Sequence, residues 1–121
     1  SHRDVFEIAR AERERMVVKP TSGYGGRDVM IGCETRESAW EERLHRAAES
    51  PGEWTLQEFV EIPEEFFPVV DTELRFEPRK VNLNPYLFGG RYAGSFVRLS
   101  TNSVINVSVG GGMAPAFVVP D

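Results

Sequence analysis

The apolar residues of this 121-residue chain recur with two different periods along its length. Between residues 35 and 50 four of them follow helical spacing, with charged residues in between: Trp40, Leu44, Ala47 and Ala48. An earlier helix is expected over residues 4–15, because Asp4 and Glu7 have capping-box spacing and good helix formers follow. The pattern therefore predicts two helices, and the charges of residues 10–15 are expected on a solvated face.

The remaining apolar runs are short and bounded by proline and glycine, which is typical of strands. The first half of the chain has three such runs, at 16–18, 28–33 and 54–62. Beyond residue 71 the chain reads as all β, with a loop around Asn84-Pro85 and Gly89-Gly90. Strands are expected there at 72–78, 92–100, 103–109, 110–113 and 114–119. Few helices and many short strands predict an α+β fold with a mostly antiparallel sheet and one or two packed helices.

Composition excludes several classes of protein. The chain is 40% hydrophobic and 27% charged, which indicates a folded domain, and its net charge of −5 disfavours nonspecific nucleic-acid binding. Neither a run of transmembrane length nor a signal-peptide pattern is present in the sequence. The single cysteine, Cys33, cannot form an internal disulfide and is expected to be buried. A cytoplasmic protein without nucleic-acid or membrane partners is therefore expected.

The two ends of the sequence suggest a piece of a longer protein. Ser1-His2 resembles the remnant of a purification tag, and the chain stops at Pro120-Asp121 directly after an apolar run. A truncated sheet exposes edges and apolar faces, so self-association of such a fragment is expected.

Side chains of the common catalytic kinds are few. His45 falls on the polar part of a predicted helix, and only the tag-like His2 could join it in a metal site or a triad. Asp71 and Glu73 stand two residues apart, which the alternation of an exposed strand explains. Trp40 and Trp54 are expected in the core. Chemistry must therefore be sought in a different kind of motif.

The most distinctive stretch is VVKPTSGYGGRDVMIG, residues 17–32, in which a glycine-rich loop joins two predicted strands. Glycines let a backbone approach a ligand closely and point N–H groups at phosphate oxygens. Thr21 and Ser22 can donate hydroxyl hydrogen bonds, and Lys19 carries a compact positive charge. Neither the Walker A pattern nor the dinucleotide fingerprint is present, and both of those lead into a helix. Taken alone, the loop favours a plain hairpin over a phosphate cover.

The elements around this loop resemble the ATP-grasp superfamily. A strand ends in lysine-proline, and a glycine-rich hairpin, a strand, an amphipathic helix and a strand ending in QEFV follow in order. The resemblance implies that Lys19 contacts the phosphates of ATP while the loop covers them through Thr21, Ser22, Gly23, Gly25 and Gly26. It implies an adenine-binding strand formed by Gln57, Glu58, Phe59 and Val60. Glu64, or in its place Glu61 or Glu65, would accept the ribose hydroxyls, since one carboxylate can bind two of them.

The C-terminal stretch GSFVRLSTNSVINVSVGGGMAPAFVV is similar to the end of circularly permuted ATP-grasp proteins related to glutathionylspermidine synthase. This similarity implies Arg98, and in second place Arg75, as cations that face an acyl-phosphate or the γ-phosphate, where charge builds during transfer. It places Asn106 near the metal site. Mg²⁺ needs oxygen ligands, but Val104 stands where the family's Glu-x-Asn pair has its acid, so the carboxylate ligands would lie outside this fragment.

With this resemblance the chain divides into three parts: an N-terminal helix (1–15), a nucleotide-binding subdomain (16–70) and the β-rich part of a second subdomain (71–121). The implied function is ATP binding in a carboxylate–amine ligase, in which ATP phosphorylates a carboxylate and an amine attacks the acyl-phosphate. The fragment alone is expected to be inactive. Two alternatives stay open: a non-catalytic ATP-grasp-like scaffold or protein-interaction module, and an unrelated α+β binding domain with a similar hairpin.

Overall fold

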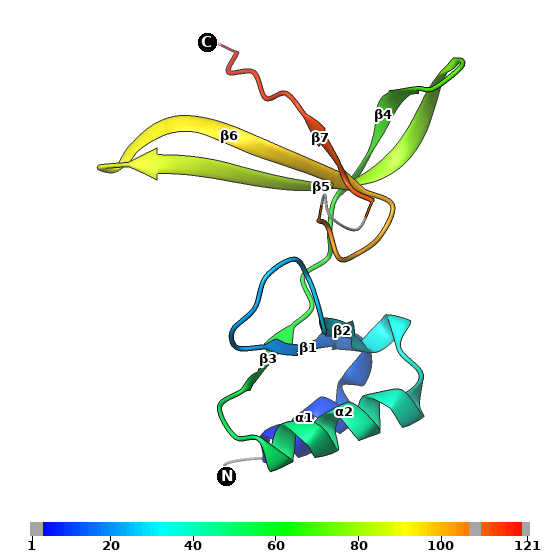
Figure 1. The fold of residues 1–121 in the computed structure, drawn as a ribbon, viewed down its shortest axis with the longest axis vertical. Coiled ribbons are helices and arrows are strands. Elements are labelled where there is room, and N and C mark those ends of the chain that lie inside the picture. The colour runs from blue at the N-terminus through cyan, green and yellow to red at the C-terminus, as the bar shows by residue number, and fades with distance from the viewer. Residues whose placement is uncertain (1–3, 107–109, 120–121) are drawn as a thin grey trace. The chain divides into compact units, whose positions relative to one another are not determined.

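The computed structural model describes residues 4–106 and 110–119 of the chain. Contacts between residues divide the chain into two compact units, Ser1–Val60 and Glu61–Asp121, which we call unit 1 and unit 2. Unit 1 contains α1 (Val5–Ala11), β1 (Met16–Pro20), β2 (Met30–Ile31), α2 (Glu37–Glu49) and β3 (Trp54–Glu58). Unit 2 contains β4 (Glu64–Val70), β5 (Leu74–Phe88), β6 (Arg91–Ser100) and β7 (Gly112–Ala114) (Figure 1). The strand pairs of the described residues are antiparallel, so the expected α+β class is confirmed.

The division after Val60 groups the elements differently from the sequence pattern. The sequence pattern places residues 61–70 in the predicted subdomain 16–70. In the structure, β4 instead pairs with β5 inside unit 2. The first helix does not stand apart either, since Ala9 is fully buried in unit 1. The assignment of nucleotide binding to residues 16–70 stays a prediction.

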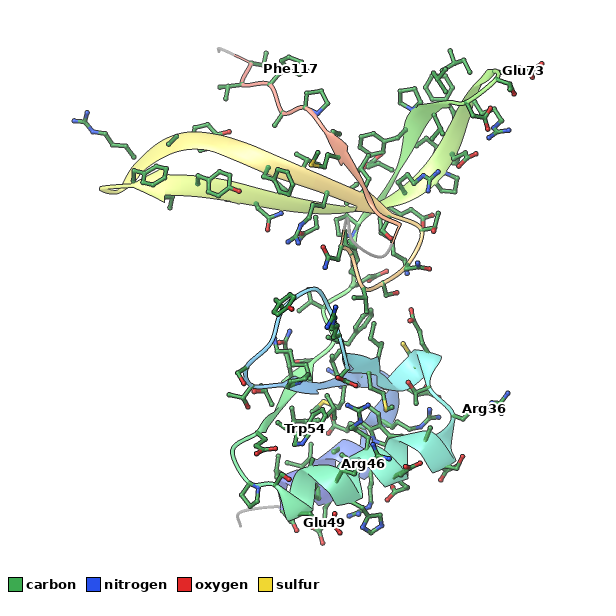
Figure 2. All side chains as sticks on the ribbon, in the orientation of Figure 1. Arg36, Arg46, Glu49, Trp54, Glu73 and Phe117 are labelled. Carbon is green, nitrogen blue, oxygen red and sulfur yellow. The ribbon has the colours of Figure 1, made fainter. Side chains whose placement is uncertain are left out.

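Unit 1 is a three-stranded sheet in the order β2-β1-β3, with α1 and α2 on one of its faces (Figure 1). Four buried residues form its core: Ala9, Val18, Trp40 and Leu44. The indole N–H of Trp40 donates to the carbonyl of Ala9 at 3.0 Å, so the largest buried side chain also has its polar atom satisfied. Trp54 lies half-buried against this core (Figure 2). The predicted apolar stripe is confirmed for Trp40, Leu44 and the half-buried Ala47, but Ala48 is exposed. The core positions of both tryptophans are confirmed.

The first helix is shorter than predicted. The carboxylate of Asp4 caps it by accepting from the backbone N–H of Phe6 at 3.0 Å, and the α-helix ends at Ala11 before a 3₁₀ turn over Arg13–Arg15. The guanidinium of Arg13 donates to the carbonyls of Gly32 and Thr35 at 2.7 and 2.5 Å. The expectation of a uniformly solvated charged face is therefore wrong at Arg13, whose side chain ties this turn to the chain after β2.

Strand β2 spans only Met30–Ile31, instead of the expected 28–33. Gly32 begins a 3₁₀ turn there, and a Cβ added at Gly32 would lie 1.7 Å from the carbonyl oxygen of Arg13. This close approach ends the strand early and turns the next residue outward. The expectation of a buried Cys33 is wrong, because Cys33 is exposed.

Unit 2 is a four-stranded sheet in the order β4-β5-β6-β7. The loop expected around Asn84-Pro85 is wrong, because β5 runs through it and turns only at Gly89-Gly90. The N–H of Val81 donates to the carbonyl of Pro63, so the backbone groups of Val81 face the β4 side. Every second residue of a strand turns its backbone groups to the same edge, and Pro85 is four residues from Val81. The nitrogen of Pro85 therefore faces the β4 side beyond the end of β4, where a missing N–H removes no ladder bond.

The last part of the chain contains less strand than expected. No regular secondary structure is found at residues 103–106 and 115–119. Strand β7 spans Gly112–Ala114, so the strands expected at 110–113 and 114–119 are wrong in extent. The expected strand at 103–109 falls partly on residues 107–109, outside the described residues. Asp71 and Glu73 lie in the turn between β4 and β5, so strand alternation does not explain their spacing. Figure 2 shows Glu73 at the tip of this hairpin.

The β4–β5 hairpin of unit 2 has one apolar and one charged face. Three cross-strand pairs form the apolar face, which we call the apolar ladder: Phe66 with Pro78, Pro68 with Phe76, and Val70 with Leu74. Phe66 and Phe76 are 71% and 64% exposed. Among the described residues of unit 2, Val97 is the buried hydrophobic residue. Unit 2 is thus held together by strand pairing more than by an enclosed core.

In the described part of the chain, neither helix is long and apolar enough to cross a lipid bilayer.

Candidate functional site

The glycine-rich loop connects the antiparallel strands β1 and β2. Gly25 and Gly26 have φ of 76° and 72°, in the left-handed region where a side chain is strained. At the end of the loop, Arg43 of α2 donates to the carbonyl of Asp28 at 3.0 Å, and its guanidinium carbon lies 4.5 Å from the ring centre of Trp54. The loop therefore needs glycine at two positions, and its end is fastened to α2 and β3.

The loop borders an open pocket of about 210 Å³, lined by Lys19, Pro20, Gly23, Tyr24, Gly25, Gly26, Arg27 and Val29. The lining contains two cations, Lys19 and Arg27, and no carboxylate. The guanidinium carbon of Arg27 lies 5.4 Å from the ring centre of Tyr24, and no acid within the described residues forms an ion pair with it. Arg27 is missing from the residues predicted to bind phosphate, although its place directly after Gly25-Gly26 could have indicated it. Positive charge and exposed backbone make this pocket suited to an anion.

Two of the predicted site regions meet on the sheet of unit 1. The ammonium of Lys19 on β1 donates to the side-chain oxygen of Gln57 on β3 at 2.6 Å. The hydroxyls of Thr21 and Thr55 lie 3.2 Å apart, and the N–H of Thr21 donates to the carbonyl of Glu53 at 2.8 Å. Ser22 is exposed in the loop. The structure thus brings the predicted phosphate lysine next to the predicted adenine strand.

Strand β3, the predicted adenine strand, has one free edge, because it pairs only with β1 among the described strands of unit 1. The N–H of Phe59 donates to the carbonyl of Arg15 at 2.7 Å, so Phe59 and Gln57 turn their backbone groups toward β1. The alternation then turns the N–H and C=O of Glu58 toward the free edge. The Glu58 carboxylate is held at 2.7 Å by Arg15, and Val60 is 71% exposed. A flat ligand with a donor beside an acceptor can pair with such an edge.

The three acids proposed for the ribose, Glu61, Glu64 and Glu65, are all exposed and belong to unit 2. Glu64 begins β4 opposite Lys80, and Glu65 follows opposite Arg79. Because Glu64 and Glu65 are neighbours in a strand, their side chains point to opposite faces of the sheet. The geometry of β4 therefore allows only one of these two to act at a given face.

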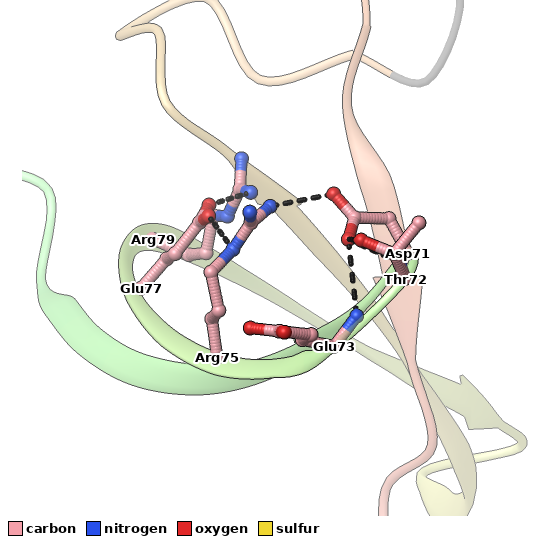
Figure 3. A network of polar contacts seen from close by, with 6 residues as sticks. All are labelled: Asp71, Thr72, Glu73, Arg75, Glu77 and Arg79. Atoms are coloured by element: carbon pink, nitrogen blue, oxygen red, sulfur yellow. Dashed lines mark hydrogen bonds and ion pairs between the residues drawn. The ribbon is translucent and has the colours of Figure 1, made fainter.

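Arg75 lies in a network of charges at the β4–β5 turn (Figure 3). Its guanidinium contacts the carboxylates of Asp71 at 2.6 Å and Glu77 at 3.4 Å, and Glu77 also binds Arg79 at 2.5 Å. The N–H and the hydroxyl of Thr72 and the N–H of Glu73 donate to Asp71, and these bonds, with the Thr72 N–H first, hold the pKa of the Asp71 carboxyl below its ordinary value. The charge of Arg75 is therefore already compensated by two carboxylates.

Arg98 on β6 has a different environment. Its Nε donates to Asn82 Oδ1 at 3.1 Å, and one terminal nitrogen donates to Asn84 Oδ1 at 3.3 Å, both on the adjacent β5. The described residues include no carboxylate within ion-pair distance of it. The guanidinium is half-buried and held by neutral amides, so its charge is not compensated. Asn82 and Asn84 were not among the predicted site residues. Their position next to Arg98 follows from the register between β5 and β6, which the sequence does not show.

Asn106 contributes a backbone contact, since its carbonyl accepts from the N–H of Gly111 at 3.0 Å. A Cβ at Gly111 would lie 2.7 Å from the same carbonyl oxygen, which explains a glycine there. No cluster of three or more histidine, cysteine, aspartate or glutamate side chains suited to a metal ion occurs in the described parts of the chain. The carboxylate set that Mg²⁺ prefers is thus not assembled around Asn106 by these residues.

Comparison with known proteins gives one informative similarity. The chain is 30% identical over 111 residues to a protein from Frankia casuarinae named putative glutamate–cysteine ligase 2-2, and the alignment covers 87% of this chain. The chain spans 12% of the length of that relative. No protein-family model matches the sequence. The chain is therefore distantly similar to a small part of a protein named as a ligase.

Proposed function

We propose that this chain is the ATP-binding portion of a carboxylate–amine ligase of the ATP-grasp type, in its circularly permuted branch. The observation that carries the proposal is the contact between Lys19 and Gln57, because it joins a cation of the loop pocket to β3, the strand with a free edge. A cationic pocket and a strand edge with unpaired backbone groups offer the two kinds of contact that ATP can use, to its phosphates and to its adenine. The name of the similar Frankia protein, a ligase named for two amino acids, fits this reaction class.

In this proposal unit 1 binds the nucleotide. The ammonium of Lys19 and the guanidinium of Arg27 hold phosphate oxygens in the loop pocket, with Thr21, Ser22 and the N–H groups around Gly23, Gly25 and Gly26 as further donors. The C=O of Glu58 accepts from the adenine amino group, and the N–H of Val60, two residues further along the same edge, donates to the ring. Gln57 orients Lys19, and Phe59 keeps the strand attached to β1 through its bond to Arg15.

Unit 2 contains the residues that the resemblance implies for the ribose and for phosphoryl transfer. Glu64 is the acid proposed for the ribose hydroxyls. Arg98 is the better candidate of the two arginines for stabilising charge on a transferring phosphoryl group, because Arg75 already binds two carboxylates. Mg²⁺ would neutralise phosphate charge during the reaction. The described residues assemble no carboxylate set around Asn106 that would hold it.

Calorimetric titration of the chain with ATP tests the nucleotide site. We expect binding that Lys19→Ala and Arg27→Ala each weaken by about tenfold or more, since a hydrogen bond to a charged group contributes about 1.5–3 kcal/mol. Arg46→Ala is the matched control, because Arg46 is an exposed cation of unit 1 that pairs with Glu42 on α2. Absence of binding, or equal affinity in all variants, would contradict the proposal and favour a non-catalytic interaction module.

A further inference from the structure

Arg98 differs from the other arginines of its sheet in what holds it. Arg75 and Arg79 bind the carboxylates of Asp71 and Glu77, at distances of 2.5 to 3.4 Å. Arg98 instead binds two side-chain amides, which carry no net charge. An amide orients a guanidinium by hydrogen bonding without neutralising it. The same sheet also contains Arg91, an exposed residue at the start of β6. Two of its four arginines therefore have compensated charges, and Arg98 is the half-buried one that neutral amides hold and whose charge remains available.

The two amides that hold Arg98 are themselves fixed. The Nδ2 of Asn84 donates to three oxygens, namely Asn82 Oδ1 at 2.8 Å, the Asn82 carbonyl at 3.1 Å and the Phe96 carbonyl at 3.1 Å. With its nitrogen held in this way, the amide must turn its Oδ1 the opposite way, toward Arg98. Asn82 Oδ1 accepts from both Asn84 and Arg98, so the three side chains form one connected network.

The register of the strands explains why these residues meet. Asn82 is directly opposite Arg98 in the β5–β6 ladder, and Asn84 is opposite Phe96. Residues two apart in a strand share a face, so the two asparagines and Arg98 lie on one face of the sheet. The three side chains are half-buried, which limits the number of orientations open to the guanidinium. This arrangement rests on paired strands, which position side chains more precisely than loops do.

The network does not use all the N–H donors of Arg98. A guanidinium has five N–H groups, and two of them are used by Asn82 and Asn84. The others form no hydrogen bond to the described residues, so they can be offered to a ligand. A planar group with several free N–H donors and uncompensated charge recognises an oxyanion, which it can bind in bidentate fashion.

We propose that Asn82 and Asn84 are positioning residues that hold the Arg98 guanidinium as a receptor for a phosphate or carboxylate group. This deepens the proposed function, on which the catalytic use of the site rests, because the proposed reaction brings a carboxylate and the γ-phosphate of ATP together. The binding of an oxyanion at Arg98 stands on the geometry of unit 2 and needs no nucleotide. Asn84 is the more informative of the two residues, since its amide nitrogen and its oxygen have separate partners.

The test follows the arginine Nε–H resonances by NMR while inorganic phosphate, and in a separate titration acetate, is added to the Lys19→Ala chain. That background removes a principal cation of the loop pocket. We expect the Arg98 resonance to shift and saturate, while the Arg75 resonance, already bound to carboxylates, does not move. A response to phosphate alone or to acetate alone identifies which group the site takes. No movement of the Arg98 resonance with either anion would overturn the proposal.

Two variants of Asn84 separate positioning from a structural role. Asn84→Asp keeps the size of the side chain and places a carboxylate against the guanidinium, so we expect the anion to bind about tenfold more weakly. Asn84→Ala removes the restraint but adds no charge, and a smaller loss is expected. Equal anion affinity in Asn84→Asp and the parent would overturn the proposal. Should either variant fail to fold, the comparison of the Arg98 and Arg75 resonances in the parent decides whether Arg98 binds the anion. ATP binding to unit 1 is measured separately, so failure of this proposal is distinguishable from failure of the proposed function.

Discussion

The ammonium of Lys19 lies 2.6 Å from the side-chain oxygen of Gln57, although the residue directly opposite Lys19 in the ladder is Thr55. The contact is therefore diagonal between neighbouring strands, and it leaves the charge of Lys19 uncompensated because an amide carries no net charge. Gln57 thus holds one cation of the loop pocket against β3. A lysine oriented by a neutral partner is prepared to bind an anion.

Changing the charge at position 57 tests this relationship. Gln57→Glu places a carboxylate next to Lys19, so we expect ATP to bind about tenfold more weakly, since the lysine then has a competing partner. Gln57→Ala keeps the charge of Lys19 available, and a smaller effect is expected. Calorimetry of both variants measures the difference. Equal loss in the two variants would show that the side chain of Gln57, and not the charge on Lys19, governs affinity.

Gly32→Ala is predicted to destabilise unit 1. The added Cβ would lie 1.7 Å from the carbonyl oxygen of Arg13, so the backbone of the 3₁₀ turn must move and the bonds donated by Arg13 are strained. Forced overpacking of this kind costs roughly 1–3 kcal/mol. Chemical denaturation followed by tryptophan fluorescence measures it, because Trp40 is buried in unit 1.

Gly112→Ala serves as the control for this substitution. A Cβ at Gly112 meets no atom within 4 Å, and its φ is not in the left-handed region. We expect the midpoint of this variant to match the parent. A Gly32→Ala protein with an unchanged midpoint would contradict the close approach between Gly32 and Arg13.

Asp71 is predicted to titrate below the ordinary range of an aspartate. Its folded-state pKa is lowered by hydrogen bonds, first of all from the N–H of Thr72. The carboxylate therefore stabilises the folded hairpin at pH values above the unfolded-state pKa, and this contribution is lost as the pH falls through the folded-state pKa. An NMR titration of the Asp71 carboxyl carbon measures the midpoint.

Thr72→Val distinguishes the contributions to this shift. The variant keeps the backbone N–H but removes the hydroxyl that donates to Asp71 at 3.1 Å. We expect the midpoint to rise part of the way toward the ordinary value. The same midpoint in both proteins would mean that the hydroxyl has no role, and a parent midpoint at or above the ordinary value would contradict the network in Figure 3.

The apolar ladder predicts self-association of the chain. Phe66 and Phe76 are largely exposed on one face of a hairpin, and exposed apolar surface of this kind favours contact between copies. Sedimentation velocity over a range of concentrations should show association in the parent and reduced association in Phe76→Lys. Glu65→Gln changes the net charge by the same amount on the opposite face and should behave as the parent does. A parent that stays monomeric at high concentration would contradict this prediction.

Part of the candidate site could be predicted from the sequence because its signals are local. The glycines at 25 and 26, Lys19 at the end of a strand and the QEFV run are each recognisable within a few residues. Arg27, Asn82 and Asn84 were not recognised, because their roles depend on partners in space. For Arg27 the relevant observation is a pocket shared with Lys19, and for the asparagines it is the register that sets β5 against β6.

By itself the sequence determined the α+β class, the buried stripe containing Trp40 and Leu44, and the glycine hairpin, because periodicity and backbone freedom act over short distances. Tertiary structure alone decided the rest. Strand β5 continues through Pro85, since the nitrogen of Pro85 faces an unpaired edge. Cys33 is exposed, next to the point where Gly32 packs against the carbonyl of Arg13. Tertiary structure also separated Arg75 from Arg98, two arginines that the resemblance had assigned the same role. Which carboxylate or amide stands beside a cation depends on strand pairing, and strand pairing is set by contacts between residues far apart in the chain.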